Sequence, residues 1–534
     1  MPGMDEFDYI IVGGGSAGCV LANRLVGKSF RVLLLEAGGE DRNPWLHIPV
    51  GYGRLYLDPR FNWRYRTASE PELDGREAVI PRGKVLGGSS AINGLLYVRG
   101  QPQDFDAWAA AGNTGWGFDD LLPYFKRSEH FHGEPGPWHG NDGPLHVSSP
   151  RQRHGLCDAF IRAAAEHAIP ENADFNGATQ AGAGYFHTTS FNGVRCSSAS
   201  AFLRPIKRDR NLCVRVNATV LRVLFEGRRA IGVEYRRNGT SEVARARLEV
   251  VLAAGAIASP HLLLASGVGP GEQIGNQGIP VIADLPGVGR NLKDHYNVRV
   301  AYRCRKPVTM NDYYSTWWGK ARLGLEYLIK RQGLLSQGAG YAGAFFSSDP
   351  AVERPDVQAH LMLFSTDAGV TQLHPYSGYT VSLYQMRPGS SGHIELGGPS
   401  FMDPPTIRFN YLSDDGDRQT LFKGMRRLVA MLEAKALSGY RDAPIGFSPR
   451  FTDQELLDYI RRKGSSAHHA SCTCRMGDDD AAVVDPELRV RNIGQLRVID
   501  ASVMPGITSG NTNAATYAIA EKGADLLIES ARRA

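Results

Sequence analysis

Histidine and cysteine side chains gather near the C-terminal end of the chain, where their types and spacing could support catalysis. His468 and His469 are adjacent, and Cys472 and Cys474 follow shortly after them. A neutral imidazole can accept a proton from a substrate hydroxyl, because the unperturbed pKa of histidine is about 6.5. The same four side chains could bind zinc, but their spacing matches no known zinc finger. We therefore expect neither a metal site nor a redox pair of cysteines, and the residues by themselves leave a proton-accepting histidine and an ordinary core histidine as the alternatives.

A glycine-rich segment near the N-terminus has the spacing of a dinucleotide-binding loop. Residues 13–18 fit the pattern G-x-G-x-x-G, and Glu36 follows about 20 residues later. The first glycine makes a sharp turn, the second lets the backbone approach a pyrophosphate, and the third permits close packing of helix on strand. Glu36 would accept hydrogen bonds from a ribose hydroxyl. The loop by itself does not distinguish NAD from FAD.

The segments around this loop have the patterns of a βαβ unit. Residues 7–12 and 31–35 are apolar runs of the kind found in buried strands, and Ser16 begins a stretch with apolar residues at helical spacing. Strand, glycine-rich turn, helix and strand in this order predict a parallel sheet.

Later parts of the chain have a different character. Apolar residues alternate over 221–225 and again over 231–235, which predicts a β-meander. Residues 421–432 have the apolar spacing of a core-facing helix, and strands are expected at 394–396 and 407–409. No low-complexity linker divides the sequence, so we expect domains that interleave along the chain.

The composition excludes several classes of protein. Of the 534 residues 42% are apolar and 22% are charged, and the net charge of +5 is not concentrated in a long basic run. We therefore expect no nucleic acid as a partner, and no apolar run approaches the ~20 residues of a transmembrane segment. The seven cysteines form no disulfide pattern and no secretion signal is found, which predicts a cytoplasmic protein.

A second glycine-rich segment, residues 83–93, combines paired glycines with small hydroxyl residues, which suit backbone that passes close to a flat or phosphorylated ligand. Together with residues 255–269, 469–477, 498–505 and 511–515, it resembles the signatures of the glucose–methanol–choline (GMC) family of FAD-dependent alcohol oxidoreductases. These segments occur in family order over the whole chain. The sequence is most similar to the bacterial alcohol, choline and sorbose dehydrogenase-like members.

The resemblance implies a fold of two interleaved parts. One is an α/β FAD-binding domain with a Rossmann-like βαβ unit and a parallel sheet, built from residues 1–155, 190–297 and 462–534. The other is an α+β substrate domain on an antiparallel sheet, built from residues 156–189 and 298–461.

The resemblance also implies which residues hold FAD. They are Gly13, Gly15, Ser16, Ala17, Gly18, Glu36, Ala37, Arg82, Leu86, Gly88, Ser89, Asn93, Gly94, Leu95, Val220, Ala254, Asp500, Ala501, Thr512 and Asn513. A helix expected from Asn513 to about Leu527 would point its N-terminus at the flavin N1–O2 edge, where its dipole stabilises negative charge on the reduced flavin. Ile92 stands where some members carry a histidine that bonds FAD covalently, so we expect non-covalent FAD.

The same resemblance implies the catalytic pair. His469 would take the hydroxyl proton while the flavin N5 takes the hydride, and Asn511 would bind the substrate oxygen. His468 departs from the family pattern, in which an aromatic residue is common at that position. In a strand, adjacent side chains point to opposite faces, so we expect only one of the two histidines to face the flavin. We assign the base to His469 and leave open whether His468 shares the role.

The interpretation is an FAD-dependent dehydrogenase or oxidase for a primary alcohol or a polyol. A hydroxynitrile-lyase-like enzyme and a flavin photodecarboxylase are alternatives on the same fold. The electron acceptor is oxygen or a quinone, and a quinone would place the protein at the periphery of the inner membrane. A monomer or a homodimer is expected.

Two features of the sequence bear on the substrate. Aromatic residues in the expected substrate region predict either an apolar pocket or ordinary core, namely Trp317, Trp318, Tyr341, Phe345, Phe346 and Phe364. Tyr341 takes the position of a carboxylate found in choline-specific relatives, and no Asp or Glu occurs between Gln332 and Ser348. A trimethylammonium group would therefore lack its counter-charge, and we expect neutral primary alcohols or polyols to be preferred to choline.

Overall fold

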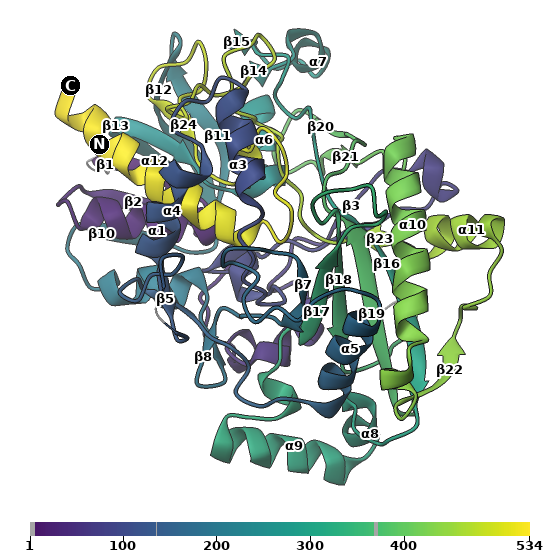
Figure 1. The fold of residues 1–534 in the computed structure, drawn as a ribbon. Helices are drawn as coiled ribbons and strands as arrows, with labels where there is room; N and C mark the ends of the chain where they lie inside the picture. Colours follow the sequence, from purple (N-terminus) through teal and green to yellow (C-terminus); the bar gives the residue numbers. More distant parts are fainter. Residues whose placement is uncertain (1–5, 135, 368–371, 534) are drawn as a thin grey trace.

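The computed structural model describes residues 6–134, 136–367 and 372–533, and two large sheets dominate it (Figure 1). The first sheet contains seven strands. In spatial order they are β10 (Leu212–Arg215), β2 (Val32–Leu35), β1 (Glu6–Val12), β13 (Thr240–Leu252), β12 (Arg229–Arg237) and β11 (Ala218–Glu226), with β24 (Leu496–Val498) also paired to β13.

This sheet combines the βαβ unit and the meander that the sequence predicts. Strands β10, β2, β1, β13 and β24 run parallel, whereas β13, β12 and β11 form the antiparallel meander. The expected parallel sheet is therefore extended by an antiparallel edge. Helix α1 (Ser16–Val26) connects β1 to β2 and packs against α12 (Asn513–Arg533), which extends the expected C-terminal helix by several residues.

The second sheet is antiparallel throughout. Its strands, in spatial order, are β22 (Arg441–Ile445), β16 (Tyr296–Cys304), β19 (Gly378–Gln385), β18 (Val357–Met362), β17 (Ala342–Phe346) and β7 (Gly182–Tyr185), and β23 (Ser465–Ser466) also pairs with β16. Helices α10 (Asp415–Leu432) and α5 (Gly155–Glu166) pack on this sheet. The helix predicted at 421–432 is the C-terminal part of α10.

Each sheet has its own apolar core, formed largely by strand residues and the helices packed on them. Successive strand residues point to opposite faces. In β19, Val381 and Leu383 belong to the core of the second sheet, whereas Thr380, Ser382 and Tyr384 line the cavity described below. The boundaries expected for the two domains stay a prediction.

Shorter elements complete the chain. The short strands are β3 (Tyr65–Arg66), β4 (Val79–Ile80), β5 (Glu129–Phe131), β6 (Leu145–Val147), β8 (Ser190–Phe191), β9 (Val194–Arg195), β14 (Val268–Gly269), β15 (Ala283–Asp284), β20 (His393–Glu395) and β21 (Thr406–Arg408). The remaining α-helices are α2 (Tyr52–Leu55), α3 (Pro102–Ala110), α4 (Phe118–Ser128), α6 (Gly255–Ala265), α7 (Gly271–Asn276), α8 (Met310–Tyr314), α9 (Trp317–Lys330) and α11 (Asp453–Lys463). None of the described helices has both the length and the apolar character needed to cross a bilayer.

Candidate active site

A cavity of about 380 Å³ lies where the carboxyl ends of β1, β2 and β13 meet one face of the second sheet. Ligands of open α/β sheets bind at this end of the parallel strands. Eighteen of the twenty residues expected to hold FAD line the cavity, and so do His469 and Asn511. The two exceptions are Gly18 and Leu86, which lie behind its wall.

These two exceptions support the loops that form the cavity. A Cβ on Gly18 would stand 1.9 Å from the carbonyl oxygen of Gly13, so only glycine permits helix α1 to pack this closely against the end of β1. The side chain of Leu86 is buried, and its Cδ2 would lie 3.1 Å from a Cβ on Gly14. Both residues therefore shape the dinucleotide loop without facing the ligand space.

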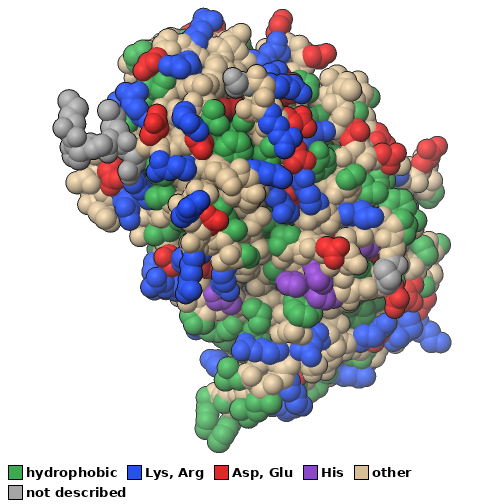
Figure 2. Space-filling model, turned by 90° about the vertical axis from the view of Figure 1, so that its left-hand side faces the viewer, with side chains coloured by type: hydrophobic (Ala, Val, Ile, Leu, Met, Phe, Trp, Pro, Cys, Tyr) green, Lys and Arg blue, Asp and Glu red, His purple; other side chains and the backbone are tan. Residues whose placement is uncertain are grey.

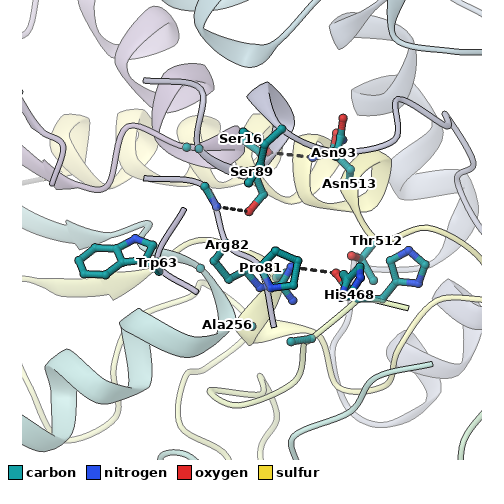
Figure 3. A pocket seen from close by; sticks show the side chains of 18 of the residues that line it. Ser16, Trp63, Pro81, Arg82, Ser89, Asn93, Ala256, His468, Thr512 and Asn513 are labelled. Carbon is teal, nitrogen blue, oxygen red and sulfur yellow. Dashed lines mark hydrogen bonds between the residues drawn. The ribbon is translucent and has the colours of Figure 1, made fainter. Parts of the chain in front are cut away.

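The two glycine-rich loops meet and leave a narrow cradle at the start of α1. A Cβ on Gly88, whose φ is +51°, would approach the Cα of Gly15 to 2.6 Å. Ser16, at the first turn of α1, accepts a hydrogen bond of 2.8 Å from Asn513 at the start of α12, and both residues line the cavity (Figure 3). Two helix N-termini therefore open toward one space, which suits a ligand with phosphate groups and a developing negative charge. FAD fits this arrangement.

Two buried carboxylates fix the backbone at this end. Glu36 accepts hydrogen bonds from the amides of Gly14 (2.9 Å) and Gly38 (2.8 Å). Burial raises the pKa of Glu36 to about 7, although these two amides lower it. Asp500 accepts from the amide of Gly255 (2.8 Å) and from the hydroxyl of Ser259. Each carboxylate holds a loop and also faces the cavity.

The expectation that only one of the two adjacent histidines faces the cavity is wrong. Strand β23 ends at Ser466, and His468 has φ of +68°, which is left-handed backbone rather than strand. The turn brings both His468 and His469 into the cavity wall. Arg82 holds the turn by donating from Nη1 to the carbonyl oxygen of His468 at 2.8 Å (Figure 3). Arg82 Nη2 and His468 Nδ1 are buried without a hydrogen-bond partner, so they are free to bind a ligand.

His469 is held on three sides. Its backbone amide donates to Oδ1 of Asp294 at 2.6 Å. Its Nδ1 lies 2.9 Å from Nδ1 of His295, and its Nε2 lies 2.9 Å from Nδ2 of Asn511. The imidazole is therefore fixed in orientation, with Nε2 beside the amide of Asn511.

The partners of His295 determine which nitrogen of His469 carries the proton. Nε2 of His295 lies 2.9 Å from the carbonyl oxygen of Met386, which can only accept, so this nitrogen is protonated. Burial lowers the pKa of His295 to about 4, so the ring is neutral and its Nδ1 carries a lone pair. His469 must then donate from Nδ1, which leaves a lone pair on its Nε2.

A second chain of hydrogen bonds leads to the same protonation state. Tyr384 donates to Oε1 of Gln358, which orients the amide so that Nε2 of Gln358 faces Oδ1 of Asn511 at 3.4 Å. Asn511 therefore presents Nδ2 to His469, and an amide nitrogen donates only. Nε2 of His469 is the acceptor in that contact. The two chains together hold a proton acceptor beside a hydrogen-bond donor in the cavity.

The electrostatic surroundings keep this acceptor neutral. Burial, reinforced by the neighbouring His295, His360 and His468, lowers the pKa of His469 well below its usual value. Burial likewise lowers the pKa of His360 and of His468 to about 3. Near pH 7 the imidazole of His469 is therefore unprotonated and able to accept a proton.

Several residues of this site were not found from the sequence. His295 is a single histidine before a strand and offers no signal. Gln358 belongs to β18 and reaches Asn511 only because the strand lies opposite the start of α12. Asn297 and Arg299 do offer a signal, since they are polar residues at alternate positions of the otherwise largely apolar strand β16 and both line the cavity.

The aromatic residues expected around the substrate have different places. Of the six, only Phe364 lines the cavity. Trp317 and Trp318 are exposed on α9, whereas Phe345 and Phe346 are buried core residues. Tyr341 is also buried and donates to the carbonyl oxygen of Gln152. Its assignment to a substrate-binding position is wrong, so the argument about choline must rest on other residues.

In the described part of the chain, the cysteines form no cluster with His468 and His469 that could hold a metal ion. Cys472 and Cys474 are buried, reduced cysteines, and burial raises the pKa of each thiol. The group with metal-ligand spacing among the described residues is formed by His130, His132 and His146, which line no part of the cavity.

Comparison with known proteins agrees with this geometry. Two family profiles described as GMC oxidoreductase match residues 7–297 and 388–520. The chain belongs to the GMC oxidoreductase family. It is 39% identical to an oxygen-dependent choline dehydrogenase of Vibrio vulnificus (strain YJ016), over 98% of this chain and 94% of that protein. It is 40% identical to an alcohol dehydrogenase (acceptor) of Pseudomonas putida, over 98% and 96%.

Solved structures of the family superimpose closely. Pyridoxine 4-oxidase from Mesorbium loti is 31% identical with a TM-score of 0.88, over 97% of this chain and 98% of that one. A formate oxidase is 25% identical with a TM-score of 0.93 over the full length of both. The expected family, the fold class and an enzyme acting on CH–OH donors are confirmed, with FAD as the cofactor of the family.

Proposed function

We propose that this GMC oxidoreductase oxidises a primary alcohol or a polyol, with His469 as the base and Asn511 as the group that binds the substrate oxygen. The observation that carries the proposal is the lone pair on Nε2 of His469 beside the amide of Asn511 in the cavity wall. FAD, when bound, supplies the hydride acceptor.

The residues of the chain account for the remaining parts of the reaction. A substrate hydroxyl that donates to Nε2 of His469 can accept from Nδ2 of Asn511, so two contacts orient its carbon. His469 then takes the hydroxyl proton, and its Nδ1 proton stays on the bond to His295. The other imidazoles around it are neutral, and the cation among the described residues whose charge opposes this protonation is Arg82, which Asp294 partly compensates.

The residues proposed to bind FAD divide between two ends of the cavity. Gly13, Gly15, Glu36 and Val220 lie at the end formed by the first sheet and suit the adenosine and pyrophosphate. The starts of α1 and α12, together with the segment around Arg82 and Gly88, suit the remainder of the pyrophosphate and the flavin. His469 and Asn511 lie in the wall next to this second end.

The alternatives on this fold are not favoured. Neither a hydroxynitrile lyase nor a flavin photodecarboxylase is among the activities named for the relatives described above. Both activities lack a hydride transfer from an alcohol, so neither would use the proton acceptor of His469 beside Asn511 in this way.

We propose oxygen or a quinone as the electron acceptor. The proposed location is the cytoplasm or the periphery of the inner membrane. The chain is proposed to act as a monomer or homodimer, with the domain boundaries given above.

Anaerobic reduction tests the proposal. A purified, yellow protein should lose its oxidised flavin band when a primary alcohol such as benzyl alcohol is added without oxygen. Repeating the reaction with oxygen and with a soluble quinone identifies the acceptor. If no alcohol of a broad panel, neutral, cationic or anionic, reduces the flavin, the proposed oxidation is refuted.

A further inference from the structure

Arg299 is a cation in the substrate part of the cavity, and no carboxylate of the described residues forms an ion pair with it. It lies on β16 and lines the cavity together with Asn297 of the same strand. The phenols of Tyr52 and Tyr56 lie near it, but burial raises the pKa of both and so keeps them neutral, and Nε of Arg299 is buried without a hydrogen-bond partner. No described carboxylate lies within ion-pair distance of its guanidinium.

The position of Arg299 is the substrate end of the cavity rather than the nucleotide end. Its charge lowers the pKa of both His360 and His468, after the larger effect of burial, so it lies near the histidines that surround His469. The carboxylates in the described cavity wall are Glu36 and Asp500, and both are bonded to backbone amides of the first sheet's loops.

We propose that Arg299 binds an anionic group of the substrate, so that the enzyme acts on a primary alcohol that also carries a carboxylate. A guanidinium presents two parallel N–H donors that match a carboxylate, and its pairing is strongest where water is excluded. Burial lowers the pKa of Arg299, which shows that its charged form is destabilised by loss of hydration. A substrate anion beside the guanidinium would offset this destabilisation. The proposal rests on the proposed function, because it names the substrate class of that same site.

The remaining side chains of this wall fit a substrate with a polar end and an apolar body. Ser382 of β19 lies opposite Arg299 of β16 and lines the cavity, so a hydroxyl donor accompanies the guanidinium, whereas the hydroxyl of Thr380 donates to the carbonyl oxygen of Phe364. Met362 and Phe364 provide apolar surface in the same wall. A trimethylammonium group would meet a cation here instead of a carboxylate, which gives a new physical reason to expect poor activity with choline.

Matched substrates test the proposal. Anaerobic flavin reduction should be faster, in kcat/KM, with 4-(hydroxymethyl)benzoate than with benzyl alcohol. The preference expected for hydrogen bonds to a charged group is about 10- to 150-fold. Arg299→Gln should remove this preference, read within each variant as the ratio of kcat/KM for 4-(hydroxymethyl)benzoate to that for benzyl alcohol, and Arg299→Lys should retain part of it. A wild-type enzyme that reacts with benzyl alcohol but does not prefer the carboxylate overturns the proposal.

A binding measurement separates this proposal from the proposed function. Benzoate lacks the hydroxyl, so its binding, read from the perturbed flavin spectrum and from thermal stabilisation, needs no turnover. Benzoate should bind wild type at least tenfold more tightly than Arg299→Gln. Thr366→Ala, a matched variant in the same wall, should bind it nearly as wild type does. Equal binding by wild type and Arg299→Gln overturns the role of Arg299, whereas failure of every alcohol to reduce the flavin refutes only the oxidation.

An independent observation concerns helix α9, which lies at one end of the molecule (Figure 1). Its outer side carries five large apolar side chains that are 60–70% exposed, namely Trp317, Trp318, Leu325, Leu328 and Ile329. Leu323 and Tyr327 attach the opposite side to the protein. Hydrophobic side chains accordingly form the projecting lower end of the molecule in Figure 2. Single exposed apolar residues are ordinary, but a group on one helix marks an interaction surface.

We infer that α9 docks on the surface of an anionic lipid bilayer. Four basic residues accompany the apolar ones, Lys320, Arg322, Lys330 and Arg331, against the single acidic residue Glu326. Interfacial helices combine Trp and Leu with Lys and Arg in this way. The chain runs from α9 through Leu334–Ser336 to Ala339 in the cavity wall, so docking would bring the membrane near the cavity.

Vesicle sedimentation with the flavin-loaded protein tests this inference without any substrate. The protein should sediment with phosphatidylglycerol vesicles and much less with phosphatidylcholine vesicles. The double variant Trp317→Ser and Trp318→Ser should bind at least about tenfold more weakly, whereas Val281→Ser, which removes an exposed valine elsewhere, should bind as wild type. Absence of wild-type binding, or unchanged binding of the double variant, overturns the inference. So does a dimer that the double variant dissociates, because a second copy would then cover α9.

Discussion

His295 should control catalysis although it does not line the cavity. Replacing it with leucine removes the acceptor for Nδ1–H of His469, which now lies 2.9 Å away. A buried donor without a partner costs about 1–3 kcal/mol. His469 avoids this cost when its proton moves to Nε2 and the amide of Asn511 turns its oxygen toward that proton, and this form cannot accept a proton from the substrate. Turning the amide gives up the contact between Oδ1 of Asn511 and Gln358, so the reactive form is disfavoured by no more than the same energy, and the rate of flavin reduction should fall by as much as about 5- to 150-fold.

Rapid-mixing measurements of anaerobic flavin reduction give this rate directly. His295→Leu should lower the limiting rate with little change in the alcohol's Kd, because the substrate contacts of His469 and Asn511 remain. His295→Gln, which retains an acceptor oxygen, should recover part of the rate. His261→Leu makes the same change at another fully buried histidine, whose pKa is likewise lowered by burial to about 4, and it should leave the rate unchanged.

Nitrogen NMR of protein labelled at histidine reads the protonation state without turnover. Wild-type His469 should show a protonated Nδ1 and an unprotonated Nε2, and His295→Leu should shift this balance toward a protonated Nε2. A wild-type signal with the proton on Nε2 would refute the reasoning. A normal rate of flavin reduction in His295→Leu would refute it as well.

Further predictions concern the base, the cofactor, the substrate and acid stability. His469→Ala should keep FAD but lose about 10²–10⁴-fold in flavin reduction, whereas Asn511→Ala should cost about 0.5–1.5 kcal/mol of barrier; rates in the reverse order would show that the roles are misassigned. Acid precipitation should release yellow FAD into the supernatant, and colour held in the pellet would indicate a covalent bond. Choline should give a lower kcat/KM than benzyl alcohol, 1-hexanol and sorbose, and the opposite order would contradict the role given to the charge of Arg299. The pKa of His295 is about 4 in the folded chain and about 6.5 when unfolded, so below pH 6.5 the unfolded chain binds the extra proton. The free energy of unfolding in urea should therefore fall by about 1 kcal/mol from this residue between pH 6.5 and 5.5, and His295→Leu should lessen the loss.

The sequence by itself determined the local elements and the nucleotide end of the site. The apolar run of β1, the glycines after it and the helical spacing of α1 are neighbours in the chain, so their pattern predicts the βαβ unit directly. The glycines of this loop predict close backbone packing for a steric reason, because a Cβ at Gly18 would collide with the backbone of Gly13. His469 and Asn511 were found because their flanking residues resemble those of a known family, and the structure brings the two side chains together.

Only the tertiary structure decided what surrounds the base. The left-handed backbone at His468 interrupts the alternation of side chains that a strand would have, and no local sequence pattern predicts it. Met386, His295 and Asn511 are far apart in the chain, yet their hydrogen bonds together fix the proton of His469. Whether an aromatic residue lies in the core, in the cavity wall or on the surface depends on what packs against its strand or helix. A local sequence pattern does not identify these packing partners. The lack of a carboxylate paired with Arg299 among the described residues is likewise a property of the assembled second sheet, which the sequence of β16 alone does not show.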